Sequence, residues 1–201
     1  EADNVVVVVA GGFGRRLRPL SERTPKPLLK VGDRALLDVL VEQIASYGFR
    51  NFLIAVNYQA DLIERHLGDG RALGMTIGYL REPEPMGTVG AVRLAAERLT
   101  RPFFVVNGDL LTRVNFQHML EFHETQGFDV TVAVKEYEVR IPYGVVELAN
   151  GEVYALEEKP SKTCIVNAGM YVLEPAMVAL LPEGRPYDMT DLIRAALDDK
   201  R

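Results

Sequence analysis

Five consecutive valines, at positions 5–9, run directly into a loop with three glycines within four positions, Gly11, Gly12 and Gly14. An uninterrupted run of β-branched residues predicts a strand that is buried on both faces, as in a parallel sheet. Glycines let the backbone turn with positive φ, and successive backbone N–H groups in such a turn can bind phosphate oxygens. The chain is therefore expected to fold around a sheet whose first strand ends at a phosphate-binding loop.

Apolar runs of strand length alternate with amphipathic helical stretches, which predicts an α/β fold with helices on both faces of a sheet. Strands are expected at 5–9, 52–56, 76–80 and 103–107, and helices at 35–47, 59–67, 88–99 and 115–126. Beyond residue 128 the pattern becomes strand-rich, with strands expected at 130–134, 144–148, 153–158 and 167–173. Asn150-Gly151 predicts a tight hairpin turn, and the side chain of Asp188 or Thr190 is expected to cap a final helix.

Charge is distributed unevenly along the chain. The 201 residues carry a formal net charge of −5, which argues against a general nucleic-acid binder. Positions 15–34 nevertheless hold seven cations and two anions, which suits a small anionic ligand. No apolar run approaches the roughly 20 residues of a membrane helix, and the lone Cys164 allows no internal disulfide. We expect a soluble, cytoplasmic protein that binds neither nucleic acid nor membrane.

Two common phosphate motifs are excluded in the glycine loop. A dinucleotide fingerprint needs G-x-G-x-x-G, but Leu17 stands at the third glycine, and the Gly-Lys-Ser/Thr of a P-loop is absent too. The loop brings its own cations instead, with Arg15 the best placed. Lys26 follows between Pro25 and Pro27, which fix φ on either side of it. A rigid surface turn with a solvated lysine is the alternative interpretation of this second element.

The pattern G-G-x-G-x-R-L-x-P-L at 11–20, followed by P-K-P-L-L at 25–29, resembles the signature of the sugar nucleotidyltransferases. The motifs are nearest to those of the mannose-1-phosphate guanylyltransferase-like members, with Ser21 where threonine is commoner. The resemblance implies a Rossmann-like mixed sheet sandwiched by helices, of the nucleotide-diphospho-sugar transferase type. It also implies a transferase that joins an NTP to a sugar 1-phosphate in nucleotide-sugar biosynthesis and releases pyrophosphate.

The same resemblance implies a role for each matching motif. Arg15, Lys26 and Asp109 would be catalytic, with Asp109 also holding Mg²⁺ against the phosphates, although an aspartate that only caps the next turn is the alternative. The nucleotide-binding residues would be Ala10, Gly11, Gly12, Gly14, Glu82, Gly87 and Gly108. The sugar-phosphate-binding residues would be Gly144, Glu158, Lys159, Asn167 and Gly169. One domain would then have a nucleotide-binding half at about 1–127 and a strand-rich sugar-phosphate half at about 128–201.

Glu82 bears on the identity of the nucleobase. Guanine presents two adjacent donors, N1–H and the N2 amine, which a carboxylate can accept together, whereas uracil or thymine presents one donor between acceptors. GTP is therefore the favoured substrate. The alternative is a solvated Glu82 without a role in the site, which would leave a uridylyl- or thymidylyltransferase of the same family open.

The match stops before one expected element. Family members usually continue into W-x-D-x-G, whose aspartate supplies a second metal carboxylate, and the sequence stops at Arg201 without it. We expect the chain to be part of a longer protein, in which a further domain and a homo-oligomer stay open. A non-catalytic nucleotide-sugar-binding domain with a regulatory or scaffolding role is the alternative to an enzyme. A glycosyltransferase would typically need a D-x-D metal motif, which the sequence lacks.

Overall fold

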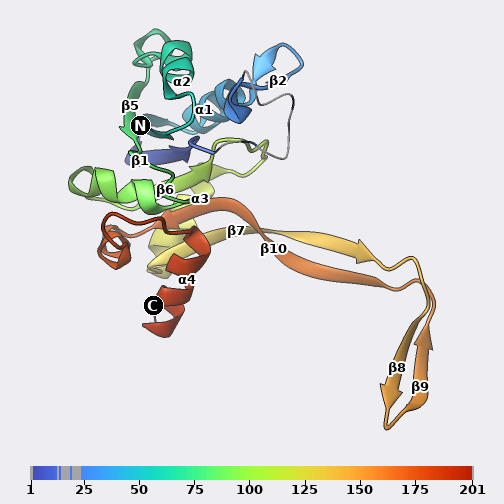
Figure 1. The fold of residues 1–201 in the computed structure, drawn as a ribbon. Helices are drawn as coiled ribbons and strands as arrows, with labels where there is room; N and C mark the ends of the chain where they lie inside the picture. Colours follow the sequence, from blue (N-terminus) through green and yellow to red (C-terminus); the bar gives the residue numbers. More distant parts are fainter. Residues whose placement is uncertain (1, 13, 15–18, 20–23, 201) are drawn as a thin grey trace. The chain divides into compact units, whose positions relative to one another are not determined.

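The computed structural model describes residues 2–12, 14, 19 and 24–200, which Figure 1 draws in colour. The chain forms two compact units: Glu1–Thr131 with Gly169–Arg201, and Val132–Ala168. The strands are β1 (Ala2–Val9), β2 (Lys30–Val31), β3 (Arg34–Ala35), β4 (Phe49–Val56), β5 (Thr76–Arg81), β6 (Phe103–Asn107), β7 (Val130–Arg140), β8 (Val145–Ala149), β9 (Glu152–Glu157) and β10 (Ser161–Leu173).

The helices are of two kinds. The α-helices are α1 (Leu36–Ser46), α2 (Ala60–Leu67), α3 (Phe116–Gln126) and α4 (Met189–Asp198). The 3-10 helices are η2 (Lys26–Leu28), η3 (Arg71–Leu73), η4 (Gly90–Arg98) and η5 (Pro175–Leu180). None of the helices formed by residues 2–12, 14, 19 and 24–200 is both long and apolar enough to span a membrane.

A mixed β-sheet lies at the centre of the first unit, with helices against it (Figure 1). Its strands follow the order β5-β4-β1-β6-β10-β7. β1 is parallel to both β4 and β6, β4 is parallel to β5, and β10 is antiparallel to β6. The expected α/β fold with a mixed central sheet is confirmed.

The core of the first unit lies against the strands on both sides of the sheet. Val6, Val7 and Val8 are completely buried, as the valine run predicts. Phe104 of β6 contacts Phe49 of β4 and Phe116 of α3, with ring centroids 5.1 and 5.6 Å apart in edge-on arrangements. Aromatic pairs of this kind contribute about 0.5–1.5 kcal/mol each beyond their buried area, and the pair of Phe104 and Phe116 packs α3 against the sheet.

Most expected elements are confirmed in type, and β7 and β10 differ most from their expected lengths. The strands expected at 5–9, 52–56, 76–80, 103–107, 144–148 and 153–158 correspond to β1, β4, β5, β6, β8 and β9. β7 continues to Arg140 and β10 begins at Ser161, because the two strands pair with one another where their side chains are exposed. Asn150 and Gly151 have φ values of 51° and 86°, which confirms the hairpin turn between β8 and β9.

The helix expected at 88–99 is instead the 3-10 helix η4, which begins only at Gly90. The two residues before it donate their N–H groups to a segment about 100 residues further along the chain. Thr88 donates its N–H to Oδ1 of Asp188 at 2.9 Å, and Val89 donates to the carbonyl of Tyr187 at 3.2 Å. The N–H groups that precede η4 are therefore satisfied by a distant segment of the chain.

The expected cap of α4 by Asp188 or Thr190 is wrong. Asp188 stands at the N-cap, but its side chain makes no capping bond to its own helix among the residues that the structure describes. The hydroxyl oxygen of Thr88 accepts the N–H of Met189 at 2.8 Å instead. The first turn of α4 is thus capped by a side chain from another part of the chain.

Candidate functional site

The parallel strands of the central sheet end together, and the predicted glycine loop follows directly. The strand register places Val9 of β1 opposite Ala55 of β4 and Asn107 of β6. Ala10 donates its N–H to the carbonyl of Ala55 at 2.9 Å, and Gly108 donates its N–H to the carbonyl of Val9 at 2.9 Å. The loops after β1 and β6 therefore begin side by side.

This edge is also the point where the strand order reverses. From β1 the chain moves to β4 and β5 on one side, whereas β6 lies on the other side of β1. In open α/β sheets, ligands bind outside the carboxyl ends of the strands at such a switch point. The topology thus points to the loop with Gly11 and Gly12 and to the Gly108-Asp109 turn.

Lys26 and Asp109 meet at this edge although they are 83 residues apart in sequence. Lys26 is the first residue of the single turn of η2. Pro25 is the N-cap of this turn, and Pro27, the next residue, is buried. The ammonium group of Lys26 donates a hydrogen bond to Oδ2 of Asp109. The side chains are 35% and 28% exposed, so the ion pair is partly accessible to solvent.

Two of the predicted glycines lie where a side chain would not fit. A Cβ at Gly108 would lie 2.9 Å from the carbonyl oxygen of Val9, which is closer than van der Waals contact permits. At Gly11 a Cβ would lie 3.0 Å from Oε1 of Glu82 and 3.3 Å from the backbone nitrogen of Asn57. These glycines let the three loops after β1, β4 and β6 approach one another.

The rest of the glycine loop is only partly described. Gly12 is exposed, and no described atom comes within 4 Å of the place where its Cβ would be. Gly14 has a φ of 58°, the positive value that its position in the loop predicts. Arg15, the predicted cation of this loop, lies outside the residues that the structure describes.

Glu82 is buried, with an exposed fraction of 9%, so it is not a solvated loop residue. Its backbone N–H donates to the carbonyl of Val56 at 2.9 Å, and its carbonyl accepts the side-chain amide of Asn57 at 3.0 Å. Its Oε2 accepts the N–H of Met86 at 2.9 Å. The carboxylate therefore lies between Gly11 and the turn that contains Gly87, and Asn57 is a supporting residue that the sequence pattern did not indicate.

Burial raises the pKa of Glu82 above its ordinary value of 4.5, and the N–H of Met86 acts in the opposite direction. The folded state therefore keeps this proton at pH values where the unfolded chain has lost it. The free energy of unfolding should consequently fall as the pH rises from 4.5 through the raised pKa. E82Q removes this titration. The free energy of unfolding of E82Q, relative to that of the parent, should therefore increase across the same pH interval.

Urea unfolding at a series of pH values from 4.5 to about 7 would measure this difference. E84Q makes the same change at an exposed position and serves as the matched control. A constant difference between E82Q and the parent over the whole interval would contradict the effect of burial on Glu82.

The predicted sugar-phosphate residues Gly144, Glu158 and Lys159 lie together in the second unit. A Cβ at Gly144 would lie 3.0 Å from Oε2 of Glu158, and Nζ of Lys159 lies 3.8 Å from Oε1 of Glu158. Lys159 donates its N–H to the carbonyl of Tyr143 at 3.3 Å and has a φ of 49°, a value uncommon for a residue with a side chain. The structure thus brings two separate motifs together within this unit.

Asn167 and Gly169 follow on the return strand β10, Asn167 in the second unit and Gly169 in the first. Gly169 has a φ of 75°, and a Cβ there would lie 2.5 Å from Nδ2 of Asn107. Asn107 is the last residue of β6 and precedes the Gly108-Asp109 turn. The amide of Asn107 is therefore a further polar group at the sheet edge, one to which the sequence motifs assigned no role.

Asp109 is the residue here that suits a metal ion. No group of three His, Cys, Asp or Glu side chains converges on a metal-sized centre within the described part of the chain. Magnesium needs fewer protein ligands, since it usually binds one or two carboxylates and completes its shell with water and phosphate oxygens. A partly exposed carboxylate beside a glycine loop that is predicted to bind phosphate fits that donor set.

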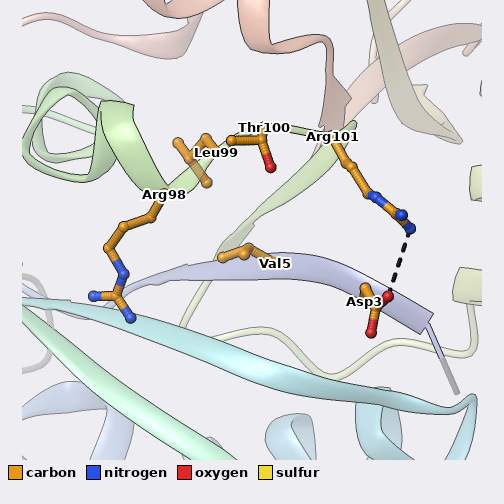
Figure 2. Close-up of a pocket in the computed structure, with 6 residues that line it drawn as sticks. All are labelled: Asp3, Val5, Arg98, Leu99, Thr100 and Arg101. Carbon is orange, nitrogen blue, oxygen red and sulfur yellow. Dashed lines mark ion pairs between the residues drawn. The ribbon is translucent and has the colours of Figure 1, made fainter.

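A small pocket at the opposite end of β1 is separate from this site (Figure 2). It has a volume of about 120 Å³ and is lined by Asp3, Val5, Arg98, Leu99, Thr100 and Arg101. The guanidinium of Arg101 lies 3.6 Å from the carboxylate of Asp3, while Arg98 extends toward Gly78, where a Cβ would lie 3.3 Å from its Nη2. The two arginines do not converge, so the pocket offers no paired cations to an anion.

Solved structures share this fold. HddC from Yersinia pseudotuberculosis complexed with GMP-PN has a TM-score of 0.70 and 25% identity, over 92% of this chain and 82% of that chain. A Bacillus anthracis structure that carries the name of a glucose-1-phosphate thymidylyltransferase has a TM-score of 0.77, over 96% of this chain and 82% of that chain. Its 22% identity shows the fold alone, which is that of the nucleotide-diphospho-sugar transferases.

Sequence relatives define the family. The mannose-1-phosphate guanylyltransferase catalytic subunit beta of Danio rerio is 38% identical over 180 residues, which cover 86% of this chain and 50% of that protein. The chain thus spans about half the length of this relative. Residues 5–201 match the family described as nucleotidyl transferase. Since that match covers nearly the whole chain, the chain belongs to the nucleotidyl transferase family.

Proposed function

We propose that this chain transfers a guanylyl group from GTP to a sugar 1-phosphate, giving a GDP-sugar and pyrophosphate, as a step of nucleotide-sugar biosynthesis. The observation that carries the proposal is the meeting of Lys26 and Asp109 beside the glycine loop, at the switch point of the sheet. The guanylyltransferase name of the relative from Danio rerio and the GMP-PN complex of HddC support guanine as the base.

On the nucleotide side, the loop with Gly11 and Gly12 binds the phosphates of GTP, and Lys26 neutralises their charge. Its ammonium stabilises the negative charge that develops on the α-phosphate and on the departing pyrophosphate. Asp109 would hold Mg²⁺, which, when bound, supplies further positive charge to the phosphate oxygens. The ion pair between Lys26 and Asp109 holds both side chains at the edge before substrate binds.

On the sugar side, Glu158 accepts hydrogen bonds from sugar hydroxyls and Lys159 binds the sugar phosphate. The positive φ of Lys159 supports this role, because strained backbone conformations cluster at ligand sites. Gly144 leaves room for the carboxylate of Glu158. Asn167, in the same unit, supplies a further polar group to this ligand.

The transfer needs no covalent enzyme intermediate. A phosphate oxygen of the sugar 1-phosphate attacks the α-phosphorus of GTP in line with the bond to the β-phosphate. The new P–O bond forms as the old one breaks, and pyrophosphate leaves with the electron pair of that bond. The protein therefore contributes by positioning the two substrates and by neutralising phosphate charge.

Pyrophosphate release tests the proposal. The protein is incubated with Mg²⁺, with GTP, UTP, dTTP, CTP or ATP, and with mannose 1-phosphate or glucose 1-phosphate. We expect release that depends on both substrates and a kcat/KM that is highest for GTP. Thermal stabilisation by the same five nucleotides measures binding separately. Binding without release would favour a non-catalytic domain, and a preference for UTP or dTTP would overturn the assignment of guanine.

A further inference from the structure

The turn of residues 86–90, called the base turn here, is bonded to the start of α4, about 100 residues further along the chain. Oδ1 of Asp188 accepts both the N–H of Thr88 at 2.9 Å and the hydroxyl of Thr88 at 3.2 Å. That hydroxyl oxygen accepts in turn the N–H of Met189 at 2.8 Å. Thr88 and the start of α4 thus satisfy each other's hydrogen bonds.

Main-chain bonds complete the same contact. Tyr187 donates its N–H to the carbonyl of Met86 at 2.9 Å, and its own carbonyl accepts the N–H groups of Val89 and Gly90 at 3.2 Å each. The base turn therefore has bonds to Tyr187 and Asp188 along nearly its whole length. A hydrogen-bonded loop of this kind has few alternative conformations.

Gly87 allows this close contact. It has a φ of 79°, and a Cβ there would lie 2.5 Å from the carbonyl oxygen of Tyr187 and 2.9 Å from Oδ1 of Asp188. The segment with Tyr187 and Asp188 therefore packs directly on the backbone of the base turn. A glycine in a turn has many accessible conformations unless neighbouring groups restrain it. Here the side chain of Asp188 is one of the groups that restrain the turn at Gly87.

The base turn connects onward to the glycine loop through Glu82. Met86 donates its N–H to Oε2 of Glu82 at 2.9 Å, and Oε1 of Glu82 is the atom that a Cβ at Gly11 would approach to 3.0 Å. A displacement of the base turn would therefore move the carboxylate that lies against the phosphate-binding loop.

Resting on the proposed function, we propose that Asp188 is a positioning residue for nucleobase recognition. Its carboxylate holds Thr88, and through it Gly87 and Glu82, in the arrangement that receives the base. The order of the base turn is thereby established before the nucleotide binds, which reduces the entropy lost on binding. Asp191, the other acidic residue in this first turn, pairs with Arg194 at 2.9 Å instead.

Kinetics of D188A, D188N and T88V test this role. D188A and T88V should raise the KM for GTP by about 10-fold, change kcat by less than about 2-fold and lower the preference for GTP over ATP. D188N keeps an oxygen acceptor for the N–H of Thr88 and should retain a KM within about 3-fold of the parent. The KM of the double variant D188A/T88V should rise by less than the product of the two single effects, because the hydroxyl bond from Thr88 to Asp188 is lost in both single variants.

D191A is the matched control, since it removes a carboxylate from the same turn of α4 without touching the base turn. Hydrogen exchange at the N–H of Thr88 is a readout that needs no activity, and exchange should be faster in D188A than in D191A. Unchanged KM and base preference in D188A, or equal effects of D188A and D191A, would overturn the inference. A parent protein that releases no pyrophosphate contradicts the proposed function instead, and the hydrogen exchange still decides the role of Asp188.

Discussion

Replacing the carboxylate of Asp109 by an amide (D109N) should lower the rate of pyrophosphate release by about 100- to 1,000-fold, and K26A should have an effect of the same order. Both residues act on charge that develops as the α-phosphorus is transferred, so the loss should appear mainly in kcat. Steady-state release of pyrophosphate from GTP and mannose 1-phosphate, at saturating Mg²⁺, measures it.

Stability should change little in the same variants. The side chains of Lys26 and Asp109 are each about one third exposed. Ion pairs that are open to solvent contribute about 0–1 kcal/mol to the free energy of unfolding. E42Q is the matched control, because it breaks the exposed ion pair between Glu42 of α1 and Arg34 of β3, neither of which is a predicted site residue. Full activity of D109N and K26A, or an equal loss in E42Q, would refute the assignment of the two residues.

Local signals explain why the sheet and its first loop could be predicted from sequence. The valines at 5–9 have one stable environment, a strand with both faces covered, and the glycines after them allow one kind of turn. β2 and β3 escaped prediction, since strands of two residues are too short to show a hydrophobic period. The extent of β7 and β10 escaped it too, because those strands are held by pairing with each other rather than by a buried face.

The site could be predicted in part for a related reason. Lys26 and Asp109 stand in recognisable motifs, but their contact follows from the position of β6 beside β1, which no single motif encodes. Asn57 and Asn107 were missed, because Asn57 bonds to Glu82 from a different loop and Asn107 lies against Gly169 of a distant strand. The bonds between Thr88 and the start of α4 left no local signal either, and they explain why the cap of α4 was predicted incorrectly.

Glu82 has a structural bond in the fold and, in the proposed function, a separate role in recognising the base. Its Oε2 accepts the N–H of Met86, which is a structural bond, whereas an ionised carboxylate has about four lone-pair sites and can accept further donors. Burial disfavours its charge, as the raised pKa indicates. In its ionised form Glu82 would therefore still have acceptors for the two donors of guanine, as the proposed function requires.

E82Q separates these two roles. The amide still offers one acceptor to Met86, so the turn should persist, but it presents one donor and one acceptor to the base in place of two acceptors. The kcat/KM for GTP should therefore fall by about 10- to 100-fold, while that for UTP or dTTP should stay level or rise. Measuring all three nucleotides with E82Q and with the exposed control E84Q gives the comparison. If Glu82 only supported the turn, E82Q would leave the ratio of the three kcat/KM values at that of the parent.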